Sequence, residues 1–209
     1  SEMTRIGPDL AQWLNNGGGQ GLLNALKSPE TIIETIHAAD LRGMGGAGFP
    51  TYKKWQAIAD QNSPTKYIIC NGNEDEPGTF KDRFLLKETP HQIIEGALIA
   101  AVATRANHVF IYVNPHQKEA LESIELAIEQ WLANPLLKAV EGYLATPLTL
   151  KAVKSSGRYI GGEETAVIST VEGYFPFPRQ KPPYPFESGV NDEPSLVNNV
   201  ETFAAAAHI

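Results

Sequence analysis

The segment Tyr67-Ile68-Ile69-Cys70-Asn71-Gly72-Asn73-Glu74-Asp75-Glu76-Pro77-Gly78 joins an apolar run directly to a polar turn. An apolar run bounded by turn residues predicts a buried strand over 67–70. Beyond it, the pattern predicts a helix that begins at Thr89-Pro90, a strand over 109–113, a helix over about 115–132 and a strand over 148–153. This alternation predicts an α/β fold whose mostly parallel sheet is flanked by helices.

The sequence on either side of this alternation predicts helices and one long loop. Residues 8–27 predict short helices interrupted by three glycines, and Ser28-Pro29-Glu30 predicts the start of a helix to about Ala39. Thr51 is expected to cap a further helix. Residues 174–186 hold five prolines and five aromatic residues, which predicts an ordered loop.

We therefore expect three parts: an N-terminal helical segment over 1–40, a ligand-binding α/β domain over 41–190, and the truncated start of a following domain over 191–209. No internal repeat is visible.

Composition and charge exclude several classes of function. The chain has 209 residues, of which 42% are hydrophobic, and this balance is typical of a globular protein. A net charge of −7 argues against a nucleic-acid partner, although a local positive site would suffice for a dinucleotide. No apolar stretch approaches the roughly 20 residues needed to cross a bilayer. We expect a cytoplasmic protein without direct membrane insertion, which could attach to the inner face of a membrane through partner subunits.

The cysteine and histidine residues predict no metal site. The single cysteine, Cys70, lies in an apolar strand and cannot hold an iron–sulfur cluster, which usually needs four thiolates. Any such cluster must lie outside this chain. The five histidines are scattered and there is no Gly-x-Ser-x-Gly segment, so metal-dependent hydrolysis and serine chemistry have no support.

Gly43-Met44-Gly45-Gly46-Ala47-Gly48 formally matches the glycine pattern of dinucleotide-binding folds. That pattern requires a strand immediately before it, whereas residues 32–41 predict a helix. Four glycines in six residues still allow the backbone to approach a flat or charged ligand closely. A tight turn packed on a helix is an equally good interpretation.

Three other segments could bind a ligand. The amides and carboxylates of residues 71–78 follow a strand and suit a polyhydroxyl chain, although they are also typical of a solvated turn. Gly161-Gly162-Glu163-Glu164 predicts either an anion site or an ordinary helix start. The loop over 174–186 offers aromatic rings for stacking, with Arg179 and Lys181 as cations, or a strip for docking a partner.

Five motifs occur in this order: Leu-Arg-Gly-Met-Gly-Gly-Ala-Gly-Phe-Pro-Thr-x-x-Lys-Trp from Leu41, Asn-x-x-Glu-x-Glu-Pro-Gly-Thr-Phe-Lys-Asp-Arg from Asn71, Gly-Glu-Glu-Thr-Ala from Gly162, Lys-Pro-Pro from Lys181 and Asn-Asn-Val-Glu-Thr from Asn198. In these motifs the chain resembles the NADH-binding FMN flavoprotein subunit of respiratory complex I and its relatives in NAD-linked hydrogenases and formate dehydrogenases. The motifs span nearly the whole chain.

The resemblance implies a Rossmann-like domain with a glycine-rich FMN-binding loop. It implies hydride transfer from NADH to FMN, then one-electron transfer to iron–sulfur centres in a C-terminal region or in partner subunits. No catalytic acid or base is expected. The residues implied around FMN are Gly43, Gly45, Lys54, Asn71, Asn73, Glu74, Tyr159, Gly162, Glu163, Asn198, Asn199 and Thr202. The residues implied to contact NADH are Phe49, Glu76, Glu164, Lys181 and Tyr184.

The chain departs from the family pattern at several positions. Met44 replaces the usual arginine and Asn73 replaces an aspartate. Ala57 stands where relatives often carry an aromatic residue, and Tyr184 stands where they usually carry phenylalanine. Tyr52-Lys53 replaces Gly-Leu. These departures bear more on NADH than on FMN. Two other functions stay open: a flavin-binding peripheral subunit of an ion-pumping ferredoxin:NAD electron-transfer complex, and a degenerate, non-catalytic docking domain.

Overall fold

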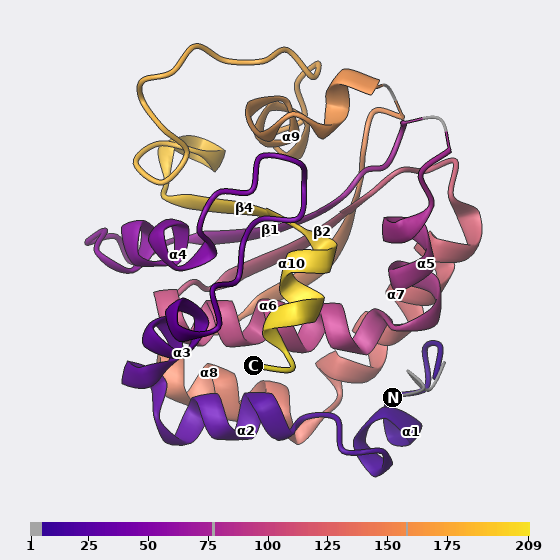
Figure 1. Ribbon diagram of the computed structural model, residues 1–209, viewed down its shortest axis with the longest axis vertical. Coiled ribbons are helices and arrows are strands. Elements are labelled where there is room, and N and C mark those ends of the chain that lie inside the picture. Colours follow the sequence, from indigo (N-terminus) through magenta and orange to yellow (C-terminus); the bar gives the residue numbers. More distant parts are fainter. Residues whose placement is uncertain (1–5, 77, 158) are drawn as a thin grey trace.

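The fold is built on a four-stranded parallel sheet (Figure 1). The computed structural model describes residues 6–76, 78–157 and 159–209. The strands are β1 (Tyr67–Gly72), β2 (His108–Val113), β3 (Thr149–Lys154) and β4 (Ser195–Asn199), in the order β3-β2-β1-β4. Every pair of neighbours in the sheet is parallel. The α/β prediction is confirmed.

Helices cover both faces of the sheet. They are α1 (Leu10–Asn15), α2 (Gln20–Lys27), η1 (Pro29–Thr31), α3 (Ile32–Ala38), α4 (Thr51–Ala59), α5 (Lys81–Glu88), α6 (Pro90–Thr104), α7 (Lys118–Leu132), α8 (Pro135–Leu144), η2 (Tyr159–Gly162), α9 (Glu164–Val171), η3 (Val190–Asp192) and α10 (Val200–Ala206). None of the helices that the structure describes is long and apolar enough to cross a membrane.

The alternation of side chains along β1 divides the core into two parts. Ile68 and Cys70 pack into a large cluster with α6, α7 and α10, whereas Tyr67 and Ile69 pack into a smaller cluster with α9. Successive residues of a strand point to opposite faces, so one continuous apolar run supplies both clusters. The central strand β1 is therefore buried on both faces over its apolar residues, and its polar residues follow at its carboxyl end.

The structure adds elements that the sequence did not predict, among them α5, α8 and β4. It also corrects one assignment, because Thr51 is the first residue of α4 and Pro50 occupies the N-cap position. Residues 195–206, within the stretch expected to begin a following domain, form a strand paired with β1 and a helix that packs on α6. The division into domains stays a prediction.

Candidate functional site

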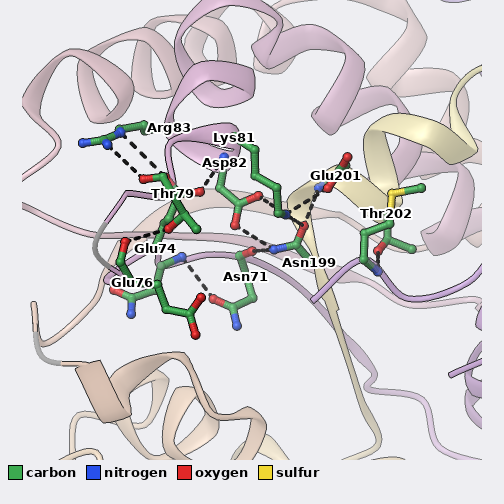
Figure 2. A network of polar contacts seen from close by, with 12 residues as sticks. Asn71, Glu74, Glu76, Thr79, Lys81, Asp82, Arg83, Asn199, Glu201 and Thr202 are labelled. Carbon is green, nitrogen blue, oxygen red and sulfur yellow. Dashed lines mark hydrogen bonds and ion pairs between the residues drawn. The ribbon is translucent and has the colours of Figure 1, made fainter. Parts of the chain in front are cut away.

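The polar motifs meet at the carboxyl ends of the parallel strands (Figures 1 and 2). Three segments define the site: the glycine loop (residues 43–49), the acidic loop that follows β1 (residues 73–80), and the asparagine corner where β4 passes into α10 (residues 198–202). Asn71 and Asn199 are partners in the register of β1 and β4, which places the last two segments side by side. Ligands of open α/β sheets bind at this edge.

The glycine loop is a closed turn with an open outer face. The Gly43 N–H donates to the Phe49 carbonyl oxygen at 2.9 Å, which closes the turn. Gly46 and Gly48 have φ values of +103° and +60°, a region that favours glycine, and a Cβ added to either would meet nothing within 4 Å. The loop follows α3, so the expectation that this is not an ordinary dinucleotide-fold turn is confirmed.

One hydrogen bond fixes the glycine loop to the asparagine corner. The Met44 N–H donates to Thr202 Oγ1 at 3.0 Å, and Thr202 is fully buried. A Cβ at Gly45 would lie 3.5 Å from the Asn199 Cβ, so the loop lies directly against Asn199. Residues far apart in sequence thus form one surface.

Asn71 connects β1 to the glycines before α9. Its Oδ1 accepts from the Asn73 N–H at 3.1 Å, and its Nδ2 donates to the Gly162 carbonyl oxygen at 2.9 Å. An asparagine amide can donate twice and accept twice. Asn71 therefore keeps hydrogen-bonding capacity for a ligand.

Glu74 holds the first turn of α5 and leaves one acceptor without a donor. Its Oε2 accepts from the Asp82 N–H at 2.9 Å. Its Oε1 is buried and has no hydrogen-bond donor among the described residues, and Arg83 Nε lies 3.7 Å away. A buried acceptor without a donor is uncommon in folded proteins and is a place where a ligand hydroxyl can be accommodated.

Asn73 links the ends of three strands. Its Oδ1 accepts from the Ser155 hydroxyl at 2.6 Å, and its Nδ2 donates to Asp75, which also accepts from Asn114. An aspartate at position 73 would face the Asp75 carboxylate. The asparagine at this position thus fits its surroundings in this chain.

Asn199 lies in a network with α5 (Figure 2). Its Nδ2 donates to Asp82 Oδ2 at 2.8 Å, and its Oδ1 accepts from Lys81 Nζ at 3.1 Å. Lys81 also pairs with Asp82 and Glu201, at 2.7 Å and 2.9 Å. Partial burial by itself would lower the pKa of Lys81, but these two carboxylates outweigh it and hold the pKa above its ordinary value.

Glu164, at the start of α9, holds two lysines. Its carboxylate pairs with Lys54 Nζ at 2.8 Å and with Lys181 Nζ at 3.0 Å. Burial opposes ionisation of Glu164, but the two ammonium groups outweigh it and keep its pKa below the ordinary value. Glu163 is the N-cap of α9, since its Oε2 accepts from the Thr165 and Ala166 N–H groups, both at 3.0 Å.

The remaining predicted residues differ in how open they are. Asn198 is buried, and its Oδ1 accepts from the Trp55 indole N–H at 3.2 Å. Phe49 and Tyr184 expose 49% and 48% of their surface, so both rings are open to a ligand. The acidic-loop residue Glu76 is exposed. The side chain of Tyr159 lies outside the described residues.

Lys81 and Asp82 are site residues that the sequence reasoning missed. They stand within the Thr-Phe-Lys-Asp-Arg part of the second motif, which was the available signal. A cavity of about 680 Å³ elsewhere in the described structure is lined by none of the predicted residues; Trp13, Gln92, Glu95 and His208 are among those that line it.

A family model described as the Nuo51 FMN-binding domain matches residues 36–208. The chain belongs to this family. This Nuo51-type chain is 44% identical over 195 residues to the F subunit of the NADH-quinone oxidoreductase of Aquifex aeolicus, a match that covers 92% of this chain and 45% of that protein. It is 40% identical over 185 residues to the alpha subunit of the NAD-reducing hydrogenase HoxS of Cupriavidus necator, covering 88% of this chain and 31% of that protein.

A solved structure of similar fold agrees with these relatives. It is an NAD+-reducing nickel–iron hydrogenase in the H2-reduced state, with a TM-score of 0.82 and 36% identity, and the match covers 98% of this chain and 35% of that chain. The Nuo51-type chain thus spans less than half the length of the relatives it matches.

Proposed function

We propose that this chain binds FMN at the carboxyl edge of its sheet and oxidises NADH there, with electrons leaving to iron–sulfur centres outside the chain. The observation that carries the proposal is the convergence of the glycine loop, the acidic loop and the asparagine corner. The Met44–Thr202 hydrogen bond joins the glycine loop to this corner, and the pairing of Asn71 with Asn199 in the sheet places the acidic loop beside it. Membership of the FMN-binding family supports it.

The residues at this edge fit FMN. The open face of the glycine loop gives room for a flat ring system, because a Cβ at Gly46 or Gly48 would point into empty space. The free hydrogen-bonding capacity of Asn71 and Glu74 Oε1, which has no hydrogen-bond donor among the described residues, suit the hydroxyl groups of a ribityl chain. When bound, FMN supplies the capacity to accept a hydride and to release electrons one at a time.

The protein contributes position and charge. Lys54 Nζ is held by Glu164 and by the Val197 carbonyl oxygen at 2.7 Å, so one cation stands fixed near the strand ends. Lys181 and the open rings of Phe49 and Tyr184 provide a cation and stacking surfaces for a dinucleotide. Hydride transfer asks little more than alignment of two cofactors, so no acid or base is assigned.

The setting of the chain is proposed by analogy with its relatives. We place it in the cytoplasm as a peripheral part of an electron-transfer assembly, with an iron–sulfur protein as the electron-accepting partner. Two of its relatives are named as subunits of an NADH-quinone oxidoreductase and of an NAD-reducing hydrogenase, which supports this placement.

Reconstitution tests the proposal. The purified chain is incubated with FMN, freed of excess FMN and mixed anaerobically with NADH, while the visible flavin absorption is followed. We expect FMN to be retained and its absorption to bleach. Retention without bleaching would contradict the hydride step, and a colourless chain that takes up no FMN would favour the docking-domain alternative.

Two matched asparagine variants locate the site. Asn71→Ala should weaken FMN binding about tenfold, since it removes one strand-end amide. Asn107→Ala alters an asparagine before β2, at the opposite edge of the sheet, where its Oδ1 accepts from the Lys66 N–H at 3.1 Å. This variant should bind FMN as tightly as the wild type. Equal losses in both variants would argue against a site at the carboxyl edge.

A further inference from the structure

We propose that Asp82 is a positioning residue for the FMN site, acting through the side-chain amide of Asn199; this inference rests on the proposed function. Asp82 lies on α5, and nothing in its geometry requires it to touch the cofactor. Its carboxylate instead sets the orientation of the residue against which the glycine loop packs (Figure 2).

Asp82 joins the acidic loop to the asparagine corner. Its side chain is only 6% exposed, and its Oδ2 accepts from Asn199 Nδ2 at 2.8 Å. Its own N–H donates to Glu74 Oε2 at 2.9 Å. Hydrogen bonds to a buried carboxylate are stronger than those between neutral groups, so this residue fixes both partners firmly.

The hydrogen-bonding capacity of Asn199 is fully used within the protein. Its Nδ2 donates to Asp82 and, at 3.3 Å, to the Asn71 carbonyl oxygen. Its Oδ1 accepts from the Glu201 N–H at 3.0 Å and from Lys81 Nζ. An asparagine amide has two donors and two acceptor positions, and all four are occupied. Asn199 therefore serves the site by holding its shape.

Only one orientation of this amide is compatible with its neighbours. A flipped amide would bring its oxygen against the Asp82 carboxylate and its NH2 group against Lys81 and the Glu201 N–H. A Cβ built on Gly45 would lie 3.5 Å from the Asn199 Cβ, so the glycine loop packs against Asn199. A shift of Asn199 would therefore change the surface on which this loop rests. Asp82 is the buried charge that prevents this shift.

A double-mutant cycle on FMN affinity tests the inference. The dissociation constant of FMN is measured by fluorescence titration for the wild type, Asp82→Asn, Asn199→Ala and the double variant. We expect Asp82→Asn to weaken binding about tenfold in the wild type and by less than about twofold when Asn199 is already alanine. Equal effects of Asp82→Asn in both backgrounds would overturn the inference.

A second readout needs no cofactor. The side-chain NH2 resonances of Asn199 are followed by NMR in the chain without FMN. Asp82→Asn should shift them and speed their exchange with water, and unchanged resonances would overturn the inference.

If the wild type took up no FMN, the proposed function would fall and the role of Asp82 with it. Normal uptake with additive effects would overturn only the role of Asp82.

Glu95 provides a control of matched burial. It is 1% exposed, and its carboxylate accepts from the Gly19 and Leu22 N–H groups and the Trp13 indole N–H, in a part of the chain that lines the separate cavity. Glu95→Gln should lower the melting temperature and leave FMN affinity unchanged.

If Asp82→Asn does not fold, Lys81→Gln replaces it, because Lys81 is 44% exposed and should show the same coupling to Asn199 with a smaller loss of FMN affinity.

Discussion

Glu164 is the residue at which the proposed FMN and NADH contacts meet. Its carboxylate anchors Lys181, in the proline-rich loop, and Lys54, which also donates to the Val197 carbonyl oxygen. Glu164→Ala should therefore weaken NADH binding about tenfold and FMN binding by no more than about twofold. Titration of each ligand separately checks this. Equal losses would remove Glu164 from the NADH role.

The hydrogen bond between Asn73 and Asp75 can be tested by exchanging the two side chains. Asn73→Asp would place two carboxylates in contact where an amide now donates to Asp75, and like charges at this distance repel. We expect the free energy of unfolding to fall by about 1–2 kcal/mol. The exchanged pair, Asn73→Asp with Asp75→Asn, should restore most of the loss. Urea denaturation of the four chains measures the coupling, and no recovery would contradict the pairing.

At the scale of elements, α6 and α10 pack closely because Gly96 of α6 lies against the backbone of α10 at Phe203. A Cβ at Gly96 would lie 1.8 Å from the Phe203 carbonyl oxygen, which belongs to the backbone and cannot rotate away. Gly96→Ala should destabilise the fold by about 1–3 kcal/mol, because overpacking forces the helices apart. The matched control is Gly142→Ala in α8, where a Cβ meets nothing within 4 Å. That variant should be neutral or slightly stabilising in thermal denaturation.

His91, in the first turn of α6, gives the fold a dependence on pH. Burial lowers its pKa from 6.5 to about 4, while its Nδ1 accepts from the Trp131 indole N–H at 3.0 Å. The unfolded chain therefore binds a proton at His91 near pH 6.5, whereas the folded chain binds it only near pH 4. Stability should fall by up to about 3 kcal/mol as the pH drops from 6.5 to 4.

The control for this dependence is His91→Asn, whose Oδ1 can still accept from Trp131 but does not titrate. Its free energy of unfolding, measured in urea across this pH range, should fall less steeply than that of the wild type. Parallel slopes for the two chains would show that other groups set the acid sensitivity.

The sequence predicted the elements whose apolar runs are long, and it missed those defined by their partners. β1 and β2 are continuous apolar runs, whereas β4 has only Leu196 and Val197 as large apolar residues and is completed by pairing with β1. α5 begins with three charged residues, and its buried surface is small. Periodicity within a window carries no information about a distant partner strand.

The same limit applied to the site. The motifs predicted Asn71, Glu74 and Glu164, because each is a polar or charged residue within a short local motif. They could not show that Asn198 Oδ1 accepts from the Trp55 indole N–H, nor that Asn199 Nδ2 donates to Asp82 of α5. Neighbouring residues of a strand point in opposite directions, and only the packing decides which direction faces a ligand.

At the scale of the whole molecule, the chain holds one thiol, whereas the proposed function needs iron–sulfur centres nearby. Cys70 is fully buried, and burial raises its pKa well above the ordinary value, so it is a poor source of thiolate. Such clusters are usually held by four thiolates. Under the proposed function, electrons accepted at the strand ends therefore leave to a centre held outside this chain; the chain spans 45% of the length of the Aquifex aeolicus relative.

With a single buried cysteine, the chain is expected not to assemble an iron–sulfur cluster by itself. Anaerobic treatment with iron, sulfide and reductant, followed by desalting, should leave no stoichiometric iron and no cluster absorption, and Cys70→Ser should behave identically. With FMN bound, the same preparation should still be bleached by NADH and should pass its electrons to a soluble artificial acceptor. Stoichiometric iron that is lost in Cys70→Ser would contradict the prediction, because it would show a cluster site formed around the one cysteine, by sharing between chains.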